Sequence, residues 1–331
     1  MQDKSIYQQL AEKLEIGGRK SKLVPRILER LLDESEARLL LAAAPPATIE
    51  ELGVKSGLDI AKVEAMIDPL FKKGVLFKSK KPDGTRYYRV RQVLQLHDST
   101  AVMNNPPPGM LDLWKEYTRT EWGEEVAVFQ SPVLRVIPIN VSIEPNSQVL
   151  ASDDVVNLIN QASNIAVTKC SCRAIDGACG QPVEVCMQLD RAAEYAIERG
   201  TGRKLSRQQA LDMLEMCEDQ GLVHVAENKQ GVGHVICNCC HDCCINWTSV
   251  RTGVGKFASP SRFRASIDFD KCNGCEKCVE RCIFDALTLT ADGTSVAVDE
   301  QKCMGCGVCR VACMLDAISL QVVRPEEFVP A

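Results

Sequence analysis

The chain has 331 residues, of which 45% are hydrophobic and 25% are charged. This length and composition predict a soluble globular protein of two or three domains. The apolar runs are too short for a membrane helix and the N-terminus lacks a signal-peptide core, so we expect a cytoplasmic protein. Residues 1–96 carry a net charge of +5 and residues 97–331 a net charge of −10, which indicates that the two parts face different partners or each other.

The first 96 residues predict helices followed by a hairpin. Apolar residues recur at helical spacing, and the last such segment covers residues 59–67. We expect Pro69 to end that helix or to begin a further turn. Two strands then flank a turn at residues 82–84. This order resembles a winged helix-turn-helix, and we expect residues 1–96 to form such a domain.

The charges of this domain favour docking to a protein, or a purely structural role, over binding to DNA. The candidate recognition helix at residues 59–67 is nearly neutral. The hairpin is basic, but the domain total of +5 is modest for contact with phosphates. The basic residues of the hairpin and its exit are Lys78, Lys80, Lys81, Arg86, Arg89 and Arg91.

The middle of the chain predicts a linker and then an α/β module. Residues 97–130 contain a proline-rich break and one helix, which we interpret as a linker and a strap. Residues 131–259 predict a strand at 133–143, a helix at 153–162 and a second strand at 164–170. Helices at about 188–199 and 206–220 and a strand at 221–228 follow. Overall we predict an α+β protein, with a C-terminal domain at residues 260–331.

Cysteine is the most informative residue type. All 18 cysteines fall within the 144 residues from Cys170 to Cys313. In a reducing compartment, cysteines at this density indicate metal ligation more than disulfides. Near the C-terminus the spacing C-x2-C-x2-C-x3-C occurs twice, 31 residues apart, which indicates an internal duplication. The first copy is Cys272, Cys275, Cys278 and Cys282, and the second is Cys303, Cys306, Cys309 and Cys313.

Residues 266–320 resemble the bacterial 2[4Fe-4S] ferredoxin family on these motifs. The resemblance implies a duplicated βαβ-like domain with two [4Fe-4S] clusters, in which the fourth ligand of each cluster crosses over from the other copy. One cluster would then use Cys272, Cys275, Cys278 and Cys313, and the other Cys303, Cys306, Cys309 and Cys282. Ile283 and Met314 stand where that family usually has proline. Zinc is the alternative metal, but zinc sites generally use two separated CxxC pairs.

Ten further cysteines precede this domain. Nine of them predict one or two additional [4Fe-4S] clusters. They are Cys170, Cys172, Cys179, Cys186, Cys237, Cys239, Cys240, Cys243 and Cys244. Our first hypothesis assigns the first four to one cluster and four of the last five to another, while assignments that mix the two groups are equally open. A zinc site is a further alternative. Cys217 lies inside a helical run and is expected to be a buried apolar residue.

The strings CSCRAIDGACGQPVEVC and VICNCCHDCC resemble a cysteine-rich module that precedes ferredoxin domains in iron–sulfur proteins of anaerobic microbes. The resemblance implies an electron-transfer subunit that relays single electrons through three or four clusters in an oxidoreductase complex. The catalytic partner would be a flavin, tungsten or heterodisulfide-reductase-like subunit, and no catalytic residue is predicted on this chain. The alternatives are a redox-sensing transcription regulator that binds DNA, and a small reductase with an open iron.

Overall fold

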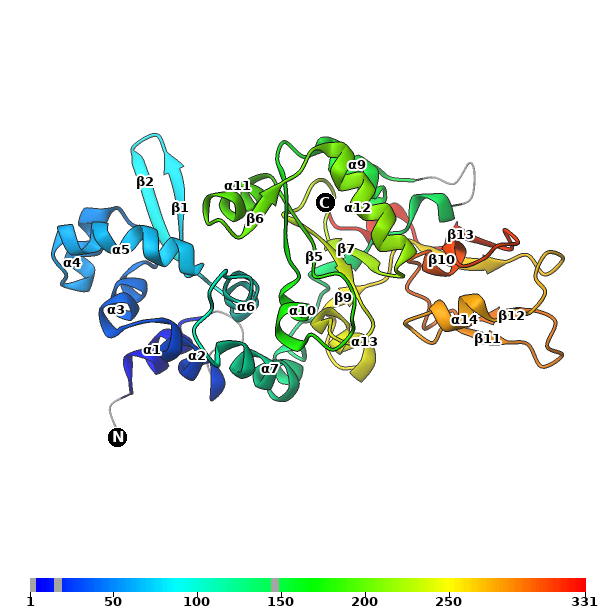
Figure 1. Cartoon of the computed structure of the whole chain (residues 1–331), viewed down its shortest axis with the longest axis horizontal. Coiled ribbons are helices and arrows are strands. Elements are labelled where there is room, and N and C mark those ends of the chain that lie inside the picture. The colour runs from blue at the N-terminus through cyan, green and yellow to red at the C-terminus, as the bar shows by residue number, and fades with distance from the viewer. Residues whose placement is uncertain (1–3, 15–19, 144–148) are drawn as a thin grey trace. The chain divides into compact units, whose positions relative to one another are not determined.

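The computed structural model describes residues 4–14, 20–143 and 149–331, and the chain divides into two compact units (Figure 1). The first unit comprises Met1–Glu125, Ser171–Gly177 and Glu198–Thr201, and the second comprises Val126–Cys170, Ala178–Ile197 and Gly202–Ala331. Within the described ranges, no helix is long and apolar enough to cross a membrane.

The first unit is mainly helical. Its helices are α1 (Ile6–Glu12), α2 (Leu23–Leu31), α3 (Glu34–Ala42), α4 (Ile49–Ser56), α5 (Ile60–Lys73), α6 (Val93–Ala101), α7 (Met110–Thr120) and α10 (Ser171–Asp176), and α8 (Trp122–Val126) lies at its boundary. One antiparallel hairpin, β1 (Leu76–Lys81) with β2 (Gly84–Arg89), follows α5. Helices followed by a hairpin therefore occur in the expected order.

The sequence sets the ends of these helices. Asp33 and Thr48 begin α3 and α4 with capping boxes, in which each side chain accepts a hydrogen bond from the third helical N–H. Gly74 ends α5 in the left-handed conformation, with φ of 79°. The predicted break at Pro69 is wrong, because α5 continues through it. Leu70 and the following residue bury the last turn in the core, which offsets the hydrogen bond that proline cannot donate.

The expected strap is part of the first unit. Helix α7 packs against α2, and Trp114 and Tyr117 are buried in an edge-to-face contact. The indole of Trp114 donates to the Thr100 hydroxyl over 3.0 Å. Residues 97–125 therefore belong to the fold of this unit.

The second unit is built on a seven-stranded sheet with the strand order β6-β4-β5-β8-β7-β3-β9. The strands are β3 (Leu134–Val136), β4 (Ile165–Lys169), β5 (Glu184–Leu189), β6 (Gly202–Lys204), β7 (Val223–Glu227), β8 (Val235–Cys239) and β9 (Ala258–Ser259). All neighbours pair antiparallel except β3 and β9, which are parallel. Helices α9 (Val155–Gln161), α11 (Asp190–Glu198), α12 (Arg207–Asp219) and α13 (Thr248–Thr252) connect them.

The two faces of this sheet differ in chemistry because side chains alternate along a strand. On one face, Met187 and Ile236 pack with Leu158 of α9 and Leu214 of α12 in a buried apolar core. Residues at the alternate positions of β5 and β8, among them Cys186, point to the opposite face. The sheet thus separates an apolar core from the face that carries cysteines.

Two sequence predictions for this region need correction. The helix expected at 188–199 begins only at Asp190, because the two preceding residues complete β5 against β8. The long strand expected from Val133 shortens to Leu134–Val136 and is followed by a 3-10 turn at Asn140–Ser142. Pro138 lacks the N–H that would continue the ladder.

The C-terminal segment is a duplicated arrangement in which the two copies exchange strands. The copies contribute β10 (Phe263–Ile267), α14 (Lys277–Arg281) and β11 (Leu287–Leu289), and then β12 (Val296–Val298), α15 (Val308–Val311) and β13 (Ile318–Val322). Strand β10 pairs with β13 and β11 pairs with β12, both antiparallel. Each two-stranded sheet therefore takes one strand from each copy.

A buried ionic network joins this segment to the larger sheet. The Asp153 carboxylate is fully buried and lies 2.7 Å from the Arg262 guanidinium and 3.6 Å from that of Arg135. Burial lowers the pKa of Arg135 to about 10, although the Asp153 charge opposes this shift. Since both cations depend on one carboxylate, Asp153 ties β3 to the residue that precedes β10.

Candidate metal centres

The first repeat of the C-terminal segment forms a cavity near the surface, where Cys275 is exposed. The cysteines that line it are Cys272, Cys275, Cys278 and Cys313. Cys275 is exposed and Cys278 is buried, so this cavity has one open side. Leu315 and Ile318 add apolar walls. The structure thus brings together the four cysteines that the ferredoxin resemblance assigns to one cluster, including Cys313 from the second copy.

The second repeat forms a cavity that lies deeper in the molecule, since Cys303 and Cys309 in its wall are buried. Its cysteines are Cys282, Cys303, Cys306 and Cys309. Gly305 lies in its wall with φ of 65°, and a Cβ atom there would lie within 3.0 Å of the Phe263 carbonyl oxygen. Only glycine permits this close approach of the loop to β10.

Both cavities suit a [4Fe-4S] cluster, because each offers four sulfur ligands and an apolar lining. Backbone N–H groups also face the sulfurs: Ala286 donates to Cys282 Sγ and Ala317 to Cys313 Sγ, each over 3.4 Å. Burial raises the pKa of the Cys306 thiol to about 12 and that of Cys309 well above its ordinary value. Thiolates in this site therefore need a cation, which iron supplies on binding.

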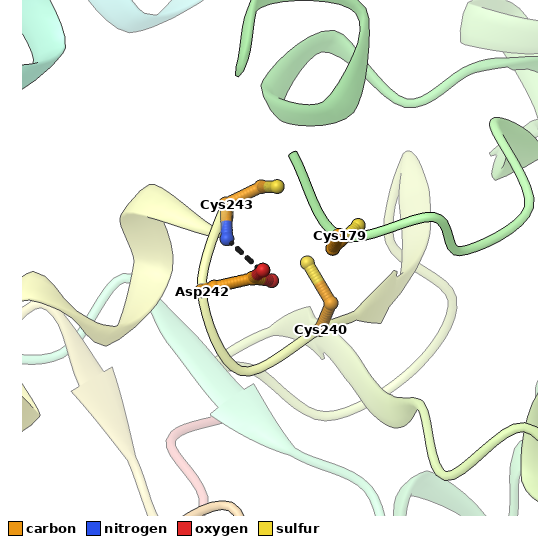
Figure 2. Close-up of side chains that lie close together, drawn as sticks. All are labelled: Cys179, Cys240, Asp242 and Cys243. Carbon is orange, nitrogen blue, oxygen red and sulfur yellow. Dashed lines mark hydrogen bonds between the residues drawn. The ribbon is translucent and has the colours of Figure 1, made fainter. Parts of the chain in front are cut away.

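One group of upstream cysteines includes an acidic residue that the sequence analysis missed. Cys179, Cys240, Asp242 and Cys243 place their ligand atoms within 4.8 Å of one another, and Figure 2 shows the four side chains around a common point. Asp242 accepts a hydrogen bond from the Cys243 N–H over 2.9 Å. Burial, together with the hydrogen bond to Cys179, raises the pKa of Cys243 to about 12. The position of Asp242 between two cysteine pairs is the signal that could have revealed it.

A second upstream group lies at the end of β8. The Cys239 thiol is hydrogen-bonded to Cys237 and Cys244, which raise its pKa together with burial. Met187 pairs with Ile236 across β5 and β8, so the next pair in this register is Cys186 and Cys237. Directly paired residues share a face, and Cys239 shares it two residues further on. Cys186, Cys237, Cys239 and Cys244 are thus candidates for one four-cysteine site.

These contacts favour the mixed assignment that the sequence left open. Cys179 is grouped with cysteines that follow β8, and Cys186 lies beside β8 by register. Cys170 donates its N–H to the Val183 carbonyl in the second unit, and Cys172 lies in α10 of the first unit. Cys217 is fully buried in α12.

Hydrogen bonds from side chains reach the sulfurs of the second group. Gln188 Nε2 donates to Cys186 Sγ over 3.2 Å, and Asn246 Nδ2 donates to Cys239 Sγ over 3.4 Å. Donors of this kind stabilise negative charge on sulfur and raise the reduction potential of a bound centre. The surroundings of this group therefore resemble a tuned redox site.

The deeper ferredoxin cavity adjoins the face of the sheet that carries this second group. Val223 of β7 lines the cavity and is paired directly with Cys239 of β8. Phe284 also lines the cavity and packs edge-on against Trp247, with ring centroids 5.0 Å apart. Trp247 in turn donates its indole N–H to the Cys240 carbonyl over 3.0 Å. These contacts join the upstream cysteine loop to the cavity wall.

Comparison with known proteins agrees with the C-terminal geometry. Residues 264–314 match the family model of the 4Fe-4S dicluster domain. No curated protein and no solved structure is matched by the chain. The dicluster match and the clustered cysteines together identify the chain as an iron–sulfur protein of mixed α and β structure.

Proposed function

We propose that the chain is an electron-transfer subunit that relays single electrons, through three or four [4Fe-4S] clusters, to or from a catalytic partner of an anaerobic redox complex. A bound [4Fe-4S] cluster gains or loses one electron, at a potential that depends on its hydrogen bonds and exposure. The proposal rests on one observation: an open cysteine-lined cavity is followed by a buried one, whose wall adjoins a third group of cysteines.

The residues around the first cavity suit exchange with another protein. Cys275 is exposed, and so are the nearby apolar side chains Phe269, Met314 and Leu315, at 65%, 82% and 44%. A partner that covers this surface would bring its own redox centre close to the cavity and exclude water. Lys277 is also exposed here and donates to the Met314 sulfur over 3.4 Å.

The residues around the deeper cavity suit a redox centre that is shielded from water and passes electrons to the next site. Cys303 and Cys309 are buried, and the apolar side chains of Leu287 and Leu320 line the same wall. Val223 of β7 also lines this cavity, and it is paired directly with Cys239 of the neighbouring strand β8. Side chains directly opposite in a sheet have Cβ atoms about 4.5–5.5 Å apart. The chain thus supports a short series of sites that begins at the surface.

Iron and sulfide analysis of the anaerobically purified chain tests this proposal. We expect about 12 irons for three clusters or about 16 for four, with matching sulfide, and split EPR signals from neighbouring reduced clusters. The Cys239→Ser variant should lose only the cluster of its own group, which leaves about 8 of 12 irons or about 12 of 16. A wild-type content of about 8 irons, or substrate turnover by the isolated chain, would overturn the relay.

The hairpin that follows α5 offers the alternative function of redox-dependent DNA binding, but its cations are largely engaged within the first unit. Arg86 forms ion pairs with Glu51 and Asp83, and Lys78 forms one with Glu198. Arg89 is buried and donates to the Lys13 carbonyl over 3.0 Å. These pairings reduce the charge available to phosphates and support docking to a protein.

A gel shift with double-stranded DNA at several salt concentrations separates the two functions. The electron-transfer proposal expects no complex that survives physiological salt, in either the oxidised or the reduced protein. A sequence-selective complex that depends on the oxidation state would support the regulator instead.

A further inference from the structure

The group of Cys179, Cys240, Asp242 and Cys243 is more compact than the ferredoxin sites. Its four ligand atoms lie within 4.8 Å of one another. In the described part of the chain, no other group of three or more cysteine, histidine or acidic side chains meets this criterion. The ferredoxin cysteines, all within the described residues, do not meet it and line two cavities instead.

This compactness distinguishes between a single ion and a cluster. Four ligands around one tetrahedral ion, with metal–sulfur bonds of about 2.3 Å, lie about 3.8 Å apart. A cubane binds each thiolate through a different iron, so its thiolates must lie farther apart. We propose that Cys179, Cys240, Cys243 and Asp242 bind one divalent ion of the zinc class through three sulfurs and one carboxylate oxygen.

The local fold holds these ligands in place. Cys240 and Cys243 are 4% and 6% exposed, in the loop that follows β8. The guanidinium of Arg251 donates to the His241 carbonyl over 2.8 Å and to the Cys244 carbonyl over 2.9 Å. These hydrogen bonds brace the loop on both sides of the ligands, so little ordering is required when the ion binds.

Asp242 completes the donor set from the solvent side. Its side chain is exposed, whereas the cysteines around it are buried or half-buried. Its carboxylate already accepts hydrogen bonds from the Cys240 and Cys243 thiols, whose protons a metal ion would displace. A carboxylate oxygen is an accepted zinc ligand beside cysteine sulfur. The ion is therefore accessible to chelators through this side.

The ion would have a structural role. Cys179 precedes β5, and the other three ligands follow β8, so the ion would cross-link two segments about 60 residues apart in sequence. The same loop carries Cys239 and Cys244 on either side of the ligands. Zinc binding would thus cross-link the segment before β5 to a loop that Arg251 already braces, without itself carrying electrons.

Metal analysis of the full-length chain, produced with both iron and zinc supplied, tests the inference. We expect one zinc per chain in the wild type, and cobalt substitution should give the thiolate charge-transfer bands of a tetrahedral site. Cys179→Ser should lose the zinc while iron and sulfide stay unchanged. Asp242→Asn, at an exposed position that cannot disturb the core, should release zinc to a chelator at least about tenfold faster.

Two control variants separate this inference from the electron relay. Cys272→Ser should lose iron and sulfide but keep its zinc, and Asp112→Asn, at an exposed position of α7, should change neither metal. Loss of about four irons with sulfide from Cys179→Ser would show a cubane in this group and overturn the inference. Absence of zinc from the zinc-supplied wild type would also overturn it, whatever the iron content of the other sites.

Discussion

Gly305 provides the sharpest test of how the chain encloses the deeper cavity. It adopts φ of 65°, and a Cβ atom there would overlap the Phe263 carbonyl oxygen and the Ser261 hydroxyl. Gly293 is a matched control in the same segment, because its φ is 71° but a Cβ atom would meet nothing within 4 Å. Substitution of each by alanine separates the cost of the backbone conformation from the cost of the close contact.

The expected destabilisation follows from these surroundings. Both alanine variants carry the left-handed penalty of about 1–2 kcal/mol. Gly305→Ala must also move the loop from β10, which costs about 1–3 kcal/mol in overpacking, and must weaken the hydrogen bond from Ser261 to the Gly305 carbonyl, which contributes about 1 kcal/mol. We therefore expect Gly305→Ala to be less stable than Gly293→Ala by about 2–4 kcal/mol.

Iron release in urea, followed with a ferrous chelator under anaerobic conditions, measures this difference as a rate. If about half of this free-energy difference appears in the barrier to opening, Gly305→Ala should release iron about five- to thirtyfold faster than Gly293→Ala. The excess should come from the deeper site, as judged by the loss of its EPR signal. Equal release rates for the two variants would refute the argument that the loop closes against β10.

Three further predictions concern other parts of the chain. Asp153→Asn should destabilise the fold by about 3–5 kcal/mol in thermal or urea unfolding, because two buried guanidinium groups lose their counter-charge; a cost below about 1 kcal/mol would contradict the ionic network. Burial raises the pKa of Tyr117, so its phenol stays neutral in the folded protein but ionises in the unfolded chain above about pH 10. Above this pH, the free energy of unfolding should therefore fall by up to about 1.4 kcal/mol per pH unit. The Tyr117 hydroxyl has no hydrogen-bond partner among the described residues, so Tyr117→Phe should stabilise by about 1 kcal/mol and lessen the alkaline loss, and a destabilised variant would refute this. Cys313→Ser should impair the surface site and Cys282→Ser the deeper one, measured by separate EPR signals, and the reverse pattern would contradict the crossed ligand sets.

The C-terminal sites could be predicted from the sequence because most of the ligands of each site lie close together in it. Three of the four cysteines in each set lie within seven residues, and the repeat of 31 residues shows the duplication directly. The resemblance to two-cluster ferredoxins then predicted that the fourth cysteine of each site comes from the other copy. The cavity linings group Cys282 and Cys313 in the same way, since the paired strands β10 and β13 come from different copies.

The upstream groups could not be derived in this way because they depend on sheet register. Cys186 comes beside Cys237 only through the pairing of β5 with β8, two strands about 50 residues apart. Cys179 joins its partners through a loop whose path no periodicity predicts. The position of Asp242 between two cysteine pairs is a local signal, but its place in a donor set depends on Cys179, which only the fold brings close.

The exchange of strands between the two copies has a consequence for how the molecule is made. Each two-stranded sheet and each cysteine-lined cavity needs residues from both copies. A nascent chain that has emerged only as far as the first copy therefore has no complete binding site for iron and sulfide. The ligand set of the deeper cavity is complete only once synthesis has passed Cys309, and that of the first cavity only once it has passed Cys313. The last part of the ferredoxin segment therefore determines when either cofactor can be accepted.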